Sequence, residues 1–124
     1  DTAGTEKYRS LSTSYYRGSN GVFIVYDITD LNSLFKLNDW ITDIQEASNC
    51  VFAGPDTIKI LVGCKCDDTS NRKISVEEGQ RIAEEYRIPF IEVSSKTNVN
   101  IDKLFYTMIS KIHEIQEQKP TTIL

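Results

Sequence analysis

Three short segments of the chain are rich in β-branched and aromatic residues. They cover residues 21–26 (GVFIVY), 58–62 (IKILV) and 89–93 (PFIEV). The first two are nearly continuous apolar runs bounded by glycine, aspartate or asparagine, a pattern typical of strands that are buried on both faces. We therefore predict three strands, with both faces of the first two covered.

The sequence after the second strand has a helical period in two places. Over residues 101–115 the large apolar side chains follow the i, i+3, i+4, i+7 spacing and fall on one stripe. Residues 75–86 form another predicted helix, because Ser75 and Glu78 have the spacing of a capping box, in which each side chain bonds to the backbone of the other residue.

Two more helices are predicted earlier in the chain. One has its apolar positions between Leu34 and Ile44, with Asp30 or Ser33 as its N-cap. A shorter one is predicted from Lys7 to Tyr16. The resulting alternation of helices and strands favours an α/β fold, in which a parallel sheet with right-handed crossovers carries helices on both faces.

Length and charge narrow the class of protein. The 124 residues carry 14 basic and 18 acidic side chains, a formal charge of −4, and 40% of them are hydrophobic. This composition predicts one globular domain over residues 1–118, followed by a short tail over residues 119–124 in which Pro120 ends the helical pattern. Since basic residues do not cluster, we expect no nucleic-acid partner.

Candidate chemistry lies directly after the predicted strands, where open parallel sheets bind their ligands. The residues there are DITD at 27–30, GCKCD at 63–67 and SSK at 94–96. The chain itself opens with DTAG at 1–4. Cys64 and Cys66 could suggest a metal or redox site, but the further ligands that such a site needs do not accompany them.

These motifs, in this order and spacing, resemble the small GTPases of the Ras superfamily. The stretch SYYRG at 14–18, leading into VYDIT at 25–29, narrows the resemblance to the Rab family. The similarity extends from residue 1 to about residue 117. It implies a three-layer sandwich of the P-loop NTPase type with a mostly parallel sheet, which this chain would hold incompletely.

The resemblance implies a guanine-nucleotide site whose base side is formed by Cys64, Lys65, Asp67, Ser94, Ser95 and Lys96. The Asp67 carboxylate would accept two hydrogen bonds from the guanine ring nitrogen and amine, which adenine cannot supply in that arrangement. Lys65 would lay its methylene stem along the base. The main-chain amides near Ser95 and Lys96 would meet the guanine oxygen.

The resemblance also implies a phosphate side. Asp1 matches the residue that holds Mg²⁺ through a water, and the Gly4 amide matches the sensor of the γ-phosphate. GTP or GDP with Mg²⁺ is therefore expected for a complete domain. Effectors and exchange factors of the Rab type are expected to contact Thr5 to Tyr16.

Several departures from the family change this expectation. The 124 residues contain neither the phosphate-binding GxxxxGK[ST] loop nor the first switch, so we expect them not to bind nucleotide tightly by themselves. Cys64 replaces an asparagine and Thr5 replaces the glutamine that orients the attacking water. No catalytic residue is therefore assigned, and slow GTP hydrolysis is expected even in a complete parent.

The ends of the chain lead to three further expectations. Because it begins inside a motif at Asp1, we expect a piece of a longer parent whose preceding strands would cover the strand at 21–26. Without them that strand would be an open edge, and the chain would not be a stable monomer. The last cysteine is Cys66, so a prenyl anchor is not expected in this form. We expect a cytoplasmic location, with the parent peripheral on endomembranes.

The sequence thus predicts a Rab-like GTP/GDP switch in vesicle-mediated transport. One alternative is a nucleotide-independent interaction module that keeps the Rab surface from Thr5 to Tyr16 and binds effectors directly. A receiver or flavodoxin-like domain shares the alternating pattern, but it does not explain KxD at 65–67 together with SSK at 94–96.

Overall fold

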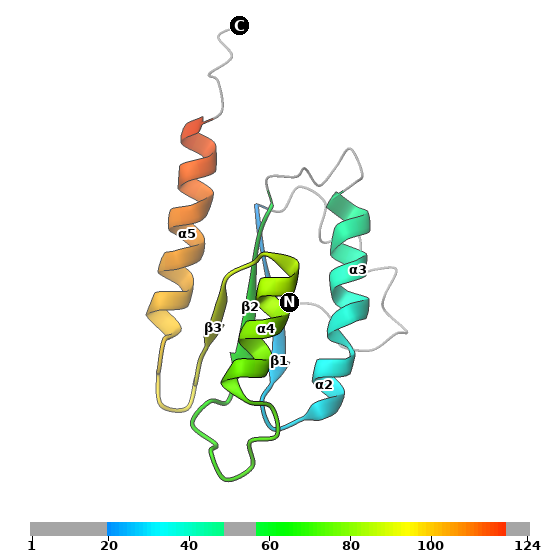
Figure 1. The fold of residues 1–124 in the computed structure, drawn as a ribbon. Helices are drawn as coiled ribbons and strands as arrows, with labels where there is room; N and C mark the ends of the chain where they lie inside the picture. Colours follow the sequence, from blue (N-terminus) through cyan, green and yellow to red (C-terminus); the bar gives the residue numbers. More distant parts are fainter. Residues whose placement is uncertain (1–19, 49–56, 119–124) are drawn as a thin grey trace, which may run out of the picture.

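The computed structural model describes residues 20–48 and 57–118, in which strands and helices alternate (Figure 1). The elements are β1 (Gly21–Asp27), α2 (Leu31–Phe35), α3 (Leu37–Ser48), β2 (Ile58–Cys64), α4 (Val76–Tyr86), β3 (Phe90–Glu92) and α5 (Ile101–Gln118). The helix predicted from Lys7 to Tyr16 lies outside the described residues. None of the described helices has both the length and the apolar character that crossing a bilayer requires.

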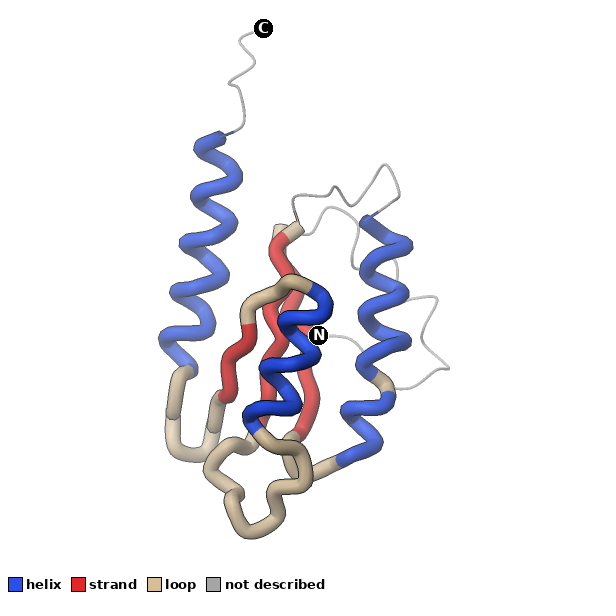
Figure 2. Tube along the Cα trace, viewed as in Figure 1, coloured by secondary structure: helices blue, strands red, loops and turns tan. Residues whose placement is uncertain are grey.

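The three strands form one parallel sheet in the order β1-β2-β3 (Figure 2). β1 pairs with β2 from Gly21 opposite Ile58 to Asp27 opposite Cys64, and β2 pairs with β3 from Leu61 opposite Phe90. The helices between consecutive strands make the crossovers that parallel neighbours require. The predicted parallel α/β arrangement is confirmed for the described part of the chain.

Helices cover the sheet on both faces (Figure 1). On one face, Leu61 of β2 belongs to a core with residues of β1, α3 and α4. On the other face, Ile60 and Val62 pack with Leu104 and Met108 of α5. Because successive side chains of a strand point to opposite faces, β2 contributes to both cores and is buried over most of its length. These layers match an incomplete sandwich of the predicted type.

The capping box predicted at the start of α4 is half right. Ser75 is the N-cap, and its hydroxyl accepts a hydrogen bond from the Glu78 amide at 3.1 Å. The Glu78 carboxylate pairs instead with Arg81, 2.7 Å away on the next turn. A charged partner on the same helix face therefore takes the place of the return bond to the Ser75 backbone.

The helix predicted between the first two strands is two helices. Asp30 caps α2 by accepting a hydrogen bond from the Asn32 amide at 2.9 Å. Lys36 follows α2 as its C-cap and separates it from α3. The apolar period alone could not show this break, because Leu34 and Leu37 both contact the same core across it.

Tyr26 has a special position at the centre of the first core. Its ring stacks on Phe90, with the centroids 6.4 Å apart, and its hydroxyl has no hydrogen-bond partner among the described residues. Burial raises the pKa of this phenol. A Cβ at Gly79 would overlap the Tyr26 hydroxyl and would lie 2.5 Å from Phe90 Cζ, so a helical glycine is needed for α4 to approach the sheet this closely.

The burial of β1 differs from the prediction. The prediction that both faces are covered is right for β2 but wrong for β1, because Val25 is 52% exposed. β1 is an outer strand of the described sheet, and Phe105 of α5 meets Phe23 edge to face while staying 52% exposed itself. Ile109, one turn further along α5, is 65% exposed. Apolar side chains therefore remain open along β1 and the adjoining side of α5.

We expect this edge to drive association of the 124-residue chain, since an outer strand with exposed apolar neighbours readily pairs with another strand. Val25→Lys should shift the sedimentation coefficient in analytical ultracentrifugation toward that of a monomer. Val99→Lys is the matched control, because Val99 is similarly exposed, at 45%, but lies in the loop after β3. A wild-type chain that sediments as a monomer and melts cooperatively would contradict the expectation.

Candidate functional site

The carboxyl ends of the three strands lie together at one edge of the sheet, at the lower end of Figure 1. The segments that leave this edge begin at residues 28, 65 and 93. Parallel pairing is the cause, because it makes neighbouring strands finish on the same side. The predicted guanine-side residues therefore lie at this edge: Cys64 ends β2, and the others belong to the two adjacent loops after β2 and after β3.

A short hydrogen bond joins these two loops. The Ser94 hydroxyl donates to Asp67 Oδ1 at 2.6 Å, and Ser94 is fully buried. A second link, from the Cys66 amide to the Val93 carbonyl at 3.1 Å, runs beside it. The structure thus brings Asp67 and Ser94 together, although 27 positions separate them in the sequence.

The loop after β3 folds back on Ser94. The Ser94 amide donates to the Val99 carbonyl at 3.1 Å, and the Ser94 hydroxyl accepts a hydrogen bond from the Thr97 amide at the same distance. Ser95 and Lys96 are exposed within this turn. Among the described residues, no group accepts a hydrogen bond from their main-chain amides. These two amides are available to an acceptor on a ligand.

Lys65 is held by Asp27, a residue that the sequence analysis listed after the first strand but to which it assigned no role. Its backbone has a left-handed conformation, with φ of 65°, and its Nζ lies 2.8 Å from Asp27 Oδ2. Asp27 also accepts hydrogen bonds from the amide and the hydroxyl of Thr29, at 2.9 and 2.7 Å. The position of Asp27 in the sequence indicated that it would lie near Lys65. Asp27 ends β1, and the parallel neighbour β2 ends at the same edge of the sheet.

The ion pair shifts the pKa of both Asp27 and Lys65. Burial acts to raise the pKa of Asp27, but the hydrogen bonds from Lys65 and Thr29 outweigh it and hold that pKa below its ordinary value. The bond to Asp27 raises the pKa of Lys65. Both groups are therefore charged at neutral pH, and the Lys65 side chain remains 63% exposed.

Cys64 is the predicted guanine-side residue whose side chain packs into the interior. Its thiol is half-buried against the core beneath α5, while its carbonyl accepts a hydrogen bond from the Ile28 amide at 3.1 Å. Burial raises the pKa of both Cys64 and Cys66, which keeps the two thiols protonated. Within residues 20–48 and 57–118, no cluster of three metal-ligating side chains occurs.

A half-buried ion pair anchors the long segment between Asp67 and α4. Arg72 binds Glu92 of β3 through two parallel hydrogen bonds of 2.9 and 2.7 Å, and it donates a third to the Ile74 carbonyl. The Lys73 and Ile74 amides both donate to the carbonyl of Ile28. These contacts fix the segment against β1 and β3, and they limit where the Asp67 loop can move.

The predicted phosphate side cannot be placed. Asp1, Gly4 and the predicted effector surface from Thr5 to Tyr16 lie outside the described residues. The roles assigned to Asp1 as a holder of Mg²⁺ and to Gly4 as a phosphate sensor remain predictions.

Comparison with known proteins shows the family to which the sequence is similar. The family model "Ras family" matches residues 1–114. The chain is 40% identical over 119 residues to "GTP-binding protein ypt2" of Schizosaccharomyces pombe, an alignment covering 96% of this chain and 56% of that protein. It is 41% identical over 114 residues to "Ras-related protein SEC4" of Candida albicans, and 39% identical over 119 residues to "Ras-related protein Rab-8A" of Gallus gallus. The alignment with SEC4 covers 92% of this chain and 52% of that protein, and the alignment with Rab-8A covers 96% of this chain and 55% of that protein. The chain therefore spans about half the length of these relatives.

The bond between Ser94 and Asp67 should contribute measurably to folding. Ser94→Ala removes a buried donor from a carboxylate and should lower the free energy of unfolding by about 2 kcal/mol, measured by urea denaturation. Ser95→Ala is the control, because Ser95 is exposed and its hydroxyl has no partner among the described residues. Equal effects of the two variants would mean that the bond is absent in solution.

The Asp27 carboxylate should make stability depend on pH in the acid range. Since its pKa is lower in the folded state, the stabilisation is present above the ordinary value of 3.8 and is lost as the pH falls through the folded value. Asp27→Asn should therefore be less stable than the wild type at about pH 7, and the difference should shrink below about pH 4. Glu114→Gln, on the exposed side of α5, is the control and should show little change at either pH.

Proposed function

The chain belongs to the Ras family and, from this premise, we propose that its described part is the guanine-recognition half of a Rab-type GTP/GDP switch that acts in vesicle-mediated transport. The observation that carries the proposal is the 2.6 Å hydrogen bond between Ser94 and Asp67. It joins the KxD motif at 65–67 to the SSK motif at 94–96.

Asp67 keeps the capacity that guanine recognition needs. Its Oδ1 accepts from Ser94, while Oδ2 has no partner among the described residues. Guanine offers two neighbouring donors, its ring N–H and its amine, and adenine offers an acceptor at the equivalent ring position. A carboxylate oriented by Ser94 therefore favours guanine and repels adenine, and the discrimination is large because the wrong base leaves a polar group unpaired.

The groups around Asp67 supply the remaining contacts in this proposal. The available amides of Ser95 and Lys96 would donate to the guanine oxygen, which is an acceptor. Lys65, turned toward Asp27 by its ion pair, would cover one face of the base with its methylene stem. Cys64 would contribute through its backbone and through packing, because its thiol faces the core and is a weak donor.

The phosphate and metal contacts belong to the proposal as well. Asp1 would hold Mg²⁺ through a water, and Gly4 would sense the γ-phosphate. The 124 residues contain no GxxxxGK[ST] loop, so the binding proposed for them is weak and directed by the base. Thr5 in the place of the glutamine that orients water implies slow hydrolysis.

Titration with GDP and ADP tests the proposal. The chain should bind GDP more tightly than ADP, and Asp67→Ala should weaken GDP binding at least about tenfold and remove the preference. Asp68→Ala is the matched control, because the Asp68 carboxylate accepts hydrogen bonds only from Asn71 in the described part of the chain. Isothermal titration calorimetry at high protein concentration would measure these weak affinities.

Equal affinity for GDP and ADP, or an unchanged affinity in Asp67→Ala, would overturn base recognition by this loop. No binding of either nucleotide, with effector binding retained, would favour the nucleotide-independent interaction module.

A further inference from the structure

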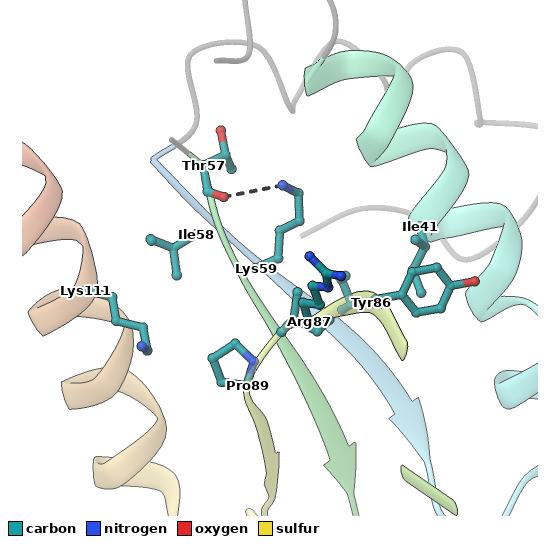
Figure 3. Close-up of a pocket in the computed structure, with 10 residues that line it drawn as sticks. Ile41, Thr57, Ile58, Lys59, Tyr86, Arg87, Pro89 and Lys111 are labelled. Atoms are coloured by element: carbon teal, nitrogen blue, oxygen red, sulfur yellow. Dashed lines mark hydrogen bonds between the residues drawn. The ribbon is translucent and has the colours of Figure 1, made fainter. Parts of the chain in front are cut away.

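A cavity lies at the opposite end of the sheet from the guanine-side loops (Figure 3). Its volume is about 320 Å³, and it is bounded by residues from the start of β2, the segment between α4 and β3, α3 and α5. This volume is at the lower end of the range typical of sites for small organic ligands. The proposed guanine site uses none of the residues that line it.

The walls of this cavity are mainly apolar. The aliphatic and proline side chains that line it are Ile24, Ile41, Ile58, Ile88 and Pro89. Tyr86 closes one side, and its hydroxyl is already bonded to Asn38 at 3.1 Å. A hydrated inorganic ion would gain little from such walls, whereas a hydrocarbon chain would be removed from water.

Three cationic side chains line the same cavity. They are Lys59, Arg87 and Lys111, which come from β2, the end of α4 and α5 and are labelled in Figure 3. None of them forms an ion pair with any carboxylate in the described part of the chain; Lys59 only approaches the Thr57 carbonyl, at 3.5 Å.

Three other cations in the described part of the chain do pair with carboxylates. Lys65, Arg72 and Arg81 each face a carboxylate within 2.8 Å. The chain as a whole has a formal charge of −4, so acidic side chains are plentiful elsewhere. The backbone of Arg87 is also held in place. Arg87 is the C-cap of α4 in a left-handed conformation, and its amide donates a hydrogen bond to the Glu84 carbonyl. Mutual repulsion of three cations around one opening is relieved when an anion binds there.

We propose that this cavity binds a single-chain anionic amphiphile. Its carboxylate, phosphate or sulfate head would lie among Lys59, Arg87 and Lys111, and its hydrocarbon chain would lie along the isoleucine walls. The small volume excludes a lipid with two acyl chains, and the walls disfavour an anion without an apolar part. The head and the chain are both required, because the anionic head interacts with the cationic side chains and the hydrocarbon chain packs against the apolar walls.

Calorimetric titration of the 124-residue chain with octanoate and octyl phosphate, below their micelle concentrations, tests the proposal. Both probes should bind with one site per chain, while octyl glucoside and octyltrimethylammonium, which carry the same chain on a neutral and a cationic head, should bind at least about tenfold more weakly. Lys111→Gln should weaken octanoate binding by about tenfold. Lys103→Gln, on the same helix but outside the cavity, should leave the affinity unchanged.

Lysine acetylation followed by mass spectrometry locates the bound probe. Saturating octanoate should slow the modification of Lys59 and Lys111 and should not affect Lys36 or Lys103. Binding of octyl glucoside as tight as that of octanoate, equal effects of Lys111→Gln and Lys103→Gln, or protection of all four lysines alike would overturn the proposal. Absence of any binding by octanoate and octyl phosphate would overturn it as well.

Discussion

The parallel pairing of β1, β2 and β3 is the constraint on which the described structure depends. It carries every strand to the same edge, so that segments far apart in the sequence leave the sheet side by side. The KxD and SSK motifs are ordinary polar loops in isolation. The structure joins them because Asp67 and Ser94 come within 2.6 Å at that edge.

β2 is the strand that makes this arrangement stable. It lies between two partners, and it contributes Leu61 to one core and Ile60 and Val62 to the other. Its burial on both faces leaves little freedom of register, since a slip by one residue would exchange the two faces. β1 lacks this double protection at Val25, which leaves one side of the described sheet open and apolar.

The two ends of the sheet differ in how their charged side chains are paired. Near the carboxyl ends of the strands, two cations are matched by carboxylates, in the pairs of Lys65 with Asp27 and Arg72 with Glu92. These pairs orient loops, and their partners were not apparent from the motifs alone. At the other end Lys59, Arg87 and Lys111 surround an apolar cavity without such partners in the described part of the chain. The two ends therefore present different chemistry to ligands.

The sequence by itself determined the features that depend on near neighbours. The apolar runs located the three strands, the Ser75 cap located α4, and the order of the elements predicted a parallel α/β fold, because periodicity and capping act over a few residues. The motifs also identified the family. Only the tertiary structure decided which partner each charged group takes: Lys65 with Asp27, Arg72 with Glu92, and Glu78 with Arg81 rather than the Ser75 backbone. It likewise decided the exposure of Val25, since burial depends on which elements pack against a strand and not on the strand's own composition.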